Sequence, residues 1–129
     1  MLNKKIYFRL IEISYALLER STIGRCRHFS FVLNKSKILA IGLNDYQKSH
    51  PMNQKFGYHP MSKLHAEMAA ALKLGMVNCA GLTMVNIRIN RENEISNSLY
   101  CRGCSNLVRA LNFKDTYYSD SNGHIQQFT

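Results

Sequence analysis

The sequence lacks an apolar run long enough to cross a lipid bilayer, which takes about 18–20 residues. The opening stretch, MLNKKIYFRL, alternates apolar with charged side chains, so it also lacks the apolar core and cleavage site of a signal peptide. Both absences favour a cytoplasmic protein with no membrane partner. With 129 residues, no internal repeat and no evident linker, we expect one domain over residues 1–129.

Acidic residues are scarce, because 8 Asp and Glu stand against 17 Lys and Arg, for a formal net charge of +9. A field of this sign attracts phosphate groups, whether on a free nucleotide or along a nucleic acid strand. The basic residues are spread along the chain and form no single patch or tail. A generally basic surface that serves solubility is therefore the alternative.

Cysteine is also sparse, with four residues, at positions 26, 79, 101 and 104. In a reducing compartment these argue against a disulfide framework and leave metal binding or catalysis open. Only Cys101 and Cys104 form a C-x-x-C pair, and no second pair exists to complete a four-cysteine structural zinc site.

The hydrophobic pattern predicts helices alternating with strands. Apolar residues recur at helical spacing over about 4–19, alternate over 27–34, and form a nearly continuous run over 37–44 that should pair with the preceding strand as a hairpin. Further helices are expected over 65–74 and 101–113, and further strands over 82–90, 115–120 and 124–128. This order predicts an α/β fold with a mixed sheet, helices on its faces, and a last strand antiparallel to the one before it.

Residues 45–63 contain both prolines and are too long and polar for a plain connector. Loops of this length in a compact domain are usually functional.

Two of the expected helices begin with residues that bind metals. Cys101 and Cys104 share one side of a first helical turn, where the helix dipole stabilises the thiolate form that binds a metal. His65 can supply a third ligand, and three protein ligands with one open position are typical of catalytic zinc. Glu67 is not needed as a ligand, so it is free to move protons of a water whose pKa zinc lowers to about 7. A redox cysteine pair and an ordinary exposed helical glutamate are the alternatives.

Together these residues match the H-x-E and C-x-x-C signature of zinc deaminases that act on nucleobases. The chain resembles the cytidine and deoxycytidylate deaminase superfamily, most closely its small phage-type members. The similarity covers about residues 29–125 and includes Gly42-Leu43-Asn44, Lys48-Ser49-His50-Pro51, His65-Ala66-Glu67, Ser98, the two cysteines and the YYSDSNG stretch. It implies a three-layer α/β/α sandwich around a five-stranded sheet.

The resemblance also implies roles for single residues. His65, Cys101 and Cys104 would hold one zinc ion per chain, and Glu67 would be the general acid and base. The backbone N–H of Ala66 would face the ring carbonyl of the pyrimidine, and Asn44 would approach the sugar. His50 would help to shape the pocket, although packing within its own loop is an equal alternative.

The sequence departs from the family where proline usually precedes the first cysteine, because Tyr100 stands there. Tyrosine can adopt the same extended backbone, so we expect the change to be tolerated, with Tyr100 and Ser98 beside the substrate pocket. A zinc-containing but inactive relative is the alternative. Small members of the superfamily frequently assemble, which leaves a homo-oligomer open.

Three functions fit these observations. The first is a zinc-dependent hydrolase that deaminates the cytosine of a free nucleotide such as dCMP, with Lys48 or Lys55 on the phosphate. The second is a deaminase of cytosine, or less readily adenine, in single-stranded DNA or RNA, which the net charge and the aromatic residues at 46, 56, 58, 117 and 118 favour. The third is a non-catalytic zinc module that binds nucleic acid. We favour the free nucleotide.

Overall fold

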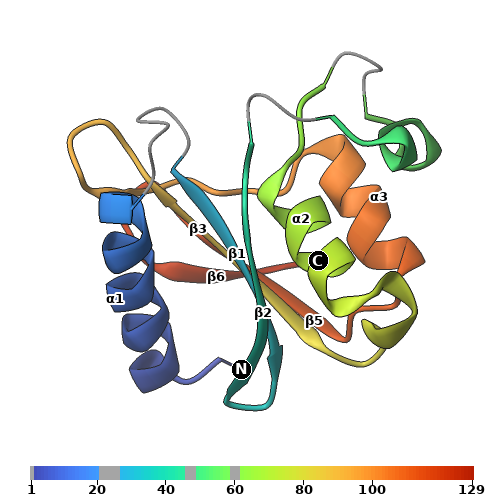
Figure 1. The fold of residues 1–129 in the computed structure, drawn as a ribbon. Coiled ribbons are helices and arrows are strands. Elements are labelled where there is room, and N and C mark those ends of the chain that lie inside the picture. The colour runs from blue at the N-terminus through green and yellow to red at the C-terminus, as the bar shows by residue number, and fades with distance from the viewer. Residues whose placement is uncertain (1, 21–26, 46–48, 59–61) are drawn as a thin grey trace.

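The computed structural model describes residues 2–20, 27–45, 49–58 and 62–129. In these residues a mixed sheet has helices on both of its faces (Figure 1). Helix α1 (Lys4–Arg20) covers one face, and helices α2 (Ala66–Leu74) and α3 (Arg102–Ala110) cover the other. The predicted three-layer α/β/α arrangement is confirmed. In the described part of the chain, no helix is both long and apolar enough to cross a membrane.

The sheet has the strand order β2-β1-β3-β5-β6. These strands are β1 (His28–Asn34), β2 (Lys37–Leu43), β3 (Thr83–Ile89), β5 (Asp115–Ser119) and β6 (Ile125–Phe128). Strand β1 is antiparallel to both β2 and β3, β3 is parallel to β5, and β6 is antiparallel to β5, as predicted for the last strand. A short sixth strand, β4 (Ile95–Ser96), pairs with the end of β3 and was not predicted, because two residues are too few to show an alternating pattern.

These pairings make β2, β3 and β5 run in the same direction, so their carboxyl ends lie at one edge of the sheet. Helix α2 follows β2 and helix α3 follows β3, and both helices begin near that edge. In open α/β sheets, ligands bind beyond the carboxyl ends of parallel strands. The topology therefore places the first turns of α2 and α3 where a ligand site is expected.

Each face of the sheet has its own apolar core. The α1 face buries alternate residues of β1 and β3 with Leu10 of α1, and the other face buries Met84 with Met68 of α2 and Leu107 of α3. This alternation agrees with the predicted strand faces, in which residues 83, 85, 87 and 89 point one way. Asn86 is an exception to the apolar pattern, because it is polar and only 4% exposed.

Helix α2 lies unusually close to β2 because Gly42 has no side chain. A Cβ at this position would lie 2.2 Å from the Ala66 carbonyl oxygen and 2.3 Å from the Ala70 backbone nitrogen. The alanines of α2 at positions 66, 69, 70 and 71 are buried. Any larger residue at Gly42 would push the helix, and with it the His65-Ala66-Glu67 segment, away from the sheet.

The long segment over 45–63 contains a 3-10 helix, η1 (Pro51–Phe56), which the sequence did not predict. His50 caps it, since the ring Nδ1 accepts the backbone N–H of Met52 at 3.1 Å. The Asn106 side chain of α3 donates to the carbonyl oxygen of Phe56 at 2.8 Å, which ties the loop to α3. A second 3-10 turn, η2 (Met76–Asn78), follows α2. Three residues considered in the sequence, at positions 26, 46 and 48, lie outside the described residues.

Candidate metal centre and active site

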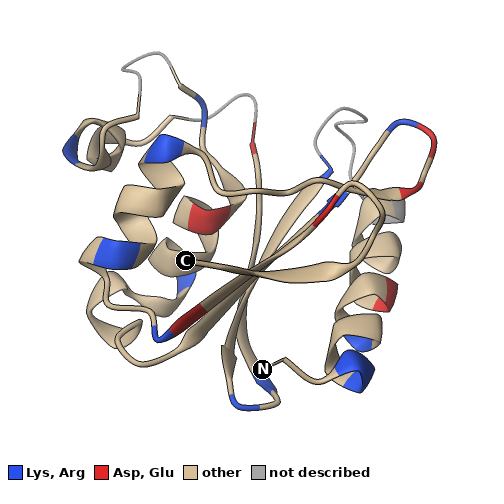
Figure 2. Ribbon diagram, turned by 180° about the vertical axis from the view of Figure 1, so that it is seen from behind, with Lys and Arg blue, Asp and Glu red and all other residues tan. Residues whose placement is uncertain are grey.

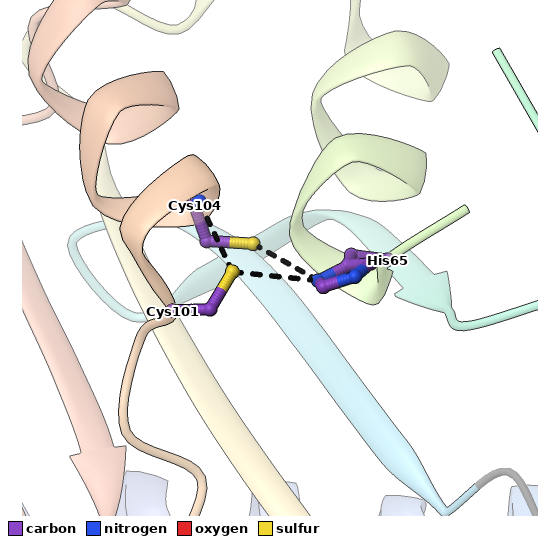
Figure 3. Close-up of side chains that lie close together, drawn as sticks. All are labelled: His65, Cys101 and Cys104. Carbon is purple, nitrogen blue, oxygen red and sulfur yellow. Dashed lines mark hydrogen bonds between the residues drawn. The ribbon is translucent and has the colours of Figure 1, made fainter. Parts of the chain in front are cut away.

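The first turns of α2 and α3 bring together three side chains of types that can bind a metal ion. His65 is the N-cap residue of α2, and Cys101 is the N-cap residue of α3, with Cys104 one turn later. The Nδ1 atom of His65 lies 3.6 Å from the Cys101 Sγ and 3.5 Å from the Cys104 Sγ (Figure 3). All three ligand atoms lie within 4.8 Å of one another.

These separations fit a zinc ion. Zinc binds sulfur at about 2.3 Å and histidine nitrogen at about 2.05 Å, so a tetrahedral site places its sulfur and nitrogen ligands roughly 3.6 Å apart. The two observed separations, 3.6 and 3.5 Å, agree with this value. One imidazole and two thiols are also a donor set that suits zinc, and three ligands leave one position open.

The two cysteines differ in burial and in charge. Hydrogen bonds from the Cys104 side chain, from His65 and from the Cys104 backbone N–H lower the pKa of Cys101 to about 4, so Cys101 is a thiolate at neutral pH. Burial raises the pKa of Cys104, which is 0% exposed. The hydrogen bond to Cys101 raises the pKa of His65. The positive charge of a bound metal ion would favour loss of the Cys104 proton.

Tyr58, just after the loop helix η1, contacts two of these three residues. Its hydroxyl lies 2.6 Å from the Cys104 Sγ, and its ring meets the His65 ring edge-on with centroids 4.8 Å apart. Burial raises the pKa of Tyr58, so the hydroxyl keeps its proton and can donate it to the sulfur. The ring lies against Gly103, where a Cβ would come within 2.6 Å of it. A glycine between the cysteines thus leaves room for the tyrosine.

The carboxylate of Glu67 lies in the first turn of α2 and is 7% exposed. Its Oε2 atom accepts a hydrogen bond from the Asn86 side chain at 2.9 Å. The Asn86 Oδ1 in turn accepts from the Ser30 hydroxyl at 2.7 Å. Neither Asn86 nor Ser30 was named from the sequence, although a lone asparagine inside the apolar run of β3 was a signal that could have drawn attention.

A cleft of about 350 Å³ opens beside these residues, within the range that holds a small organic ligand. Six of the residues named from the sequence line it, namely Asn44, His65, Ala66, Glu67, Ser98 and Cys101. Four others line it that were not named, namely His28, Lys63, Leu64 and Leu99. Lys63 is exposed, and it brings a positive charge to a wall of the cleft.

The remaining named residues lie elsewhere. His50 caps η1, as described above, and Tyr100 is 5% exposed, with its hydroxyl donating to the carbonyl oxygens of Met84 and Tyr117. Neither is among the residues that line the cleft. Lys55 is exposed on η1, with its ammonium 6.0 Å from the centre of the Phe56 ring. Lys48 lies outside the described residues.

His28, at the start of β1, adds a neutral ring to the cleft. Burial is the main cause that lowers its pKa from 6.5 to about 4, and the positive charges of Arg88 and His65 lower it further. The backbone N–H of His28 donates to the Asn44 Oδ1 at 3.3 Å. This bond fixes the Asn44 side chain just beyond the end of β2.

No protein-family model matches the sequence, and no curated protein matches it. Among solved structures, the chain is similar to the apo form of the dCMP deaminase from cyanophage S-TIM5. The two share 20% sequence identity over 92% of this chain and 86% of that chain, with a TM-score of 0.59. The fold is the same. At this identity the similarity extends to the α/β architecture.

Proposed function

We propose that the chain is a zinc-dependent hydrolase that converts a cytosine base to uracil, with a free nucleotide such as dCMP as its substrate. The observation that carries the proposal is the cluster of three zinc-type ligands beside one cleft, because His65 and Cys101 line that cleft together with the Glu67 carboxylate. The H-x-E and C-x-x-C signature and the shared fold with a phage dCMP deaminase support it.

His65, Cys101 and Cys104 would hold the zinc, which when bound supplies a water with a pKa near 7. In the overall reaction the water oxygen bonds to C4 of the cytosine ring, the bond from C4 to its amino nitrogen breaks, and ammonia leaves. Glu67 would move two protons in turn, one from the attacking water to the ring nitrogen, and then one from the hydroxyl formed at C4 to the departing amino nitrogen. One carboxylate can act as the base and as the acid, because each proton that it accepts is passed on and the carboxylate is regenerated.

The first turn of α2 offers a donor to the substrate. The backbone N–H of Ala66 is at the start of the helix, where N–H groups have no partner within the helix. It can therefore donate to the ring carbonyl of a pyrimidine. Asn44, held by the His28 backbone, would contact the sugar. Ser98 lines the cleft, but its hydroxyl donates to the Asn86 carbonyl oxygen at 2.8 Å, so we assign it a supporting role.

The surroundings of the cleft favour a free nucleotide over a strand. Lys63 is an exposed cation on the wall of the cleft, suited to one phosphate, alongside the proposed contact of Lys48. Of the aromatic residues considered for base stacking, Phe56, Tyr58 and Tyr117 are at most 6% exposed and belong to the apolar cores. Rings that are buried cannot stack on the bases of a strand.

The test is incubation of the zinc-loaded protein with dCMP, deoxycytidine and cytosine-containing single strands, followed by mass analysis of the products. We expect uracil formation from dCMP, slower from deoxycytidine, and little from the strands. Turnover of strands alone would replace the nucleotide with a polynucleotide as substrate. Full zinc content with no turnover of any of the three would favour the zinc-containing module without activity.

A further inference from the structure

We propose that Asn86 positions the Glu67 carboxylate, and that Ser30 sets the orientation of the Asn86 side-chain amide. In this arrangement one oxygen of Glu67 is held and the other is left to carry the proton. The inference rests on the proposed function for its effect on turnover, but the contact itself can be measured without any substrate.

The sheet register places both residues beneath α2. Ser30 of β1 and Asn86 of β3 are direct partners across the antiparallel strand pair. The neighbours of Asn86 in β3, Val85 and Ile87, point into the α1 core, so Asn86 points toward the α2 side. Ser30 and Asn86 are 1% and 4% exposed. Polar side chains this deeply buried are unfavourable unless they are hydrogen-bonded, so their contacts define what they do.

The contacts fix which end of the Asn86 amide faces Glu67. The amide nitrogen lies 2.9 Å from the Glu67 Oε2 and 3.4 Å from the backbone carbonyl oxygen of Ser98, and a carboxylate and a carbonyl can only accept. The amide oxygen lies 2.7 Å from the Ser30 hydroxyl, which donates to it. Turning the amide over would place its oxygen against two other oxygens. Hydrogen bonds therefore run in one direction, from the Ser30 hydroxyl to the Asn86 amide and from that amide to the Glu67 carboxylate.

These hydrogen bonds make the two carboxylate oxygens of Glu67 unequal. The Oε2 accepts from Asn86, so a proton on that atom would compete with the amide N–H. The Oε1 atom makes no hydrogen bond among the described residues. Because it is also absent from the buried polar atoms without a partner, it is accessible to solvent, on the side of the cleft that Glu67 lines. Proton transfer is thereby directed to Oε1. Asn86 touches neither ligand nor substrate, so it is a positioning residue.

The kinetic test uses Asn86→Leu, which keeps the volume of the side chain and removes the donor. We expect kcat for dCMP to fall about 10- to 100-fold, with KM and zinc content nearly unchanged, as is usual for partners that orient a catalytic group. Thr116→Val is the matched control, because Thr116 is a buried polar residue of the same sheet that bonds to Phe128 instead. We expect it to keep the wild-type kcat.

A double-mutant cycle separates positioning from general damage. If Asn86 acts through Glu67, then Asn86→Leu should have no further effect on the residual rate of Glu67→Gln. An equal fold-loss in both backgrounds would overturn the proposal. If Asn86→Leu does not fold, Ser30→Ala carries the same cycle, since it removes a single hydroxyl; we expect a loss of a few-fold that also vanishes with Glu67→Gln.

The contact can also be read by NMR of the side-chain amides of ¹⁵N-labelled protein. The signals of the Asn86 side chain are assigned as those that disappear in Asn86→Leu. We expect their protons to exchange slowly with water. We also expect their chemical shifts to change clearly in Glu67→Gln but not in Thr116→Val. Asn86 chemical shifts that do not change in Glu67→Gln would overturn the proposal. If the wild-type protein shows no turnover but the Asn86 chemical shifts change in Glu67→Gln, the proposed function is wrong and the contact between Asn86 and Glu67 is confirmed.

Discussion

At the scale of single residues, the ionisable side chains of the site have different kinds of partner. Cys101 is held as a thiolate beside His65, whereas the Glu67 carboxylate is bound by a neutral amide and not by a cation. A lysine or arginine in place of Asn86 would hold the carboxylate firmly but would oppose its protonation. The neutral amide orients the carboxylate without placing a positive charge beside it.

The structure adds Lys63 as a candidate contact for the substrate phosphate. It lines the cleft, whereas Lys55, named from the sequence, lies on η1 beside Phe56. We expect Lys63→Ala to raise KM for dCMP about tenfold, the usual scale for one charge-assisted contact, and to leave KM for deoxycytidine unchanged because that substrate has no phosphate. Steady-state kinetics on the two substrates measures this.

Lys55→Ala is the matched control for charge, since it removes one exposed lysine away from the cleft. It should leave both KM values as in the wild type. An equal rise in KM for dCMP and deoxycytidine in Lys63→Ala would show that the lysine does not contact phosphate.

At the scale of elements, the site depends on two helix N-termini and on one returning loop. The helices and the hairpin were predictable, because the periodicity of apolar residues and the His65 and Cys101 positions are local in the sequence. The contacts of Asn86 and Tyr58 within the site were not predictable from the sequence. The strand register determines the partners of Asn86, and the path of the loop determines those of Tyr58. The loop residues 51–58 lie against α3, so the loop supports the proposed metal ligands of that helix.

The contact of Tyr58 with Cys104 leads to a prediction about metal affinity. Tyr58→Phe keeps the ring beside His65 and Gly103 but removes the hydroxyl that reaches the sulfur. Partners that orient and stabilise a metal ligand contribute about 10–100-fold to affinity, so we expect zinc affinity to fall by that factor. Competition against a chromogenic chelator measures it without reference to activity.

Tyr15→Phe is a suitable control, since that hydroxyl donates to the Asn93 carbonyl oxygen on the far side of the sheet. Its zinc affinity should equal that of the wild type. Unchanged affinity in Tyr58→Phe would mean that the hydroxyl does not support the bound metal.

At the scale of the whole molecule, the charge of +9 is spread over both helical layers and the β1–β2 turn (Figure 2). Such a field attracts any polyanion, so weak binding of a strand is expected whatever the substrate. Binding alone therefore does not identify the substrate, but the salt dependence of turnover does.

A strand that contacts several lysines and arginines would lose affinity steeply with salt, with a log–log slope of about −0.7 for each phosphate neutralised. A free nucleotide engages one phosphate, so we expect KM for dCMP to depend only weakly on salt from low to physiological concentration. Kinetics over a salt series measures the slope. A steep slope together with turnover of oligonucleotides alone would reverse our choice of substrate.

The central claim is that the three ligands and Glu67 form one hydrolytic site. It is tested most directly by incubating the zinc-loaded protein with dCMP in ¹⁸O-labelled water and measuring the mass of the product. We predict a uracil nucleotide that carries one ¹⁸O atom, and a rate at least about 10²-fold lower in Glu67→Gln with its zinc retained. Full zinc content with no conversion of dCMP, or a wild-type rate in Glu67→Gln, would contradict it.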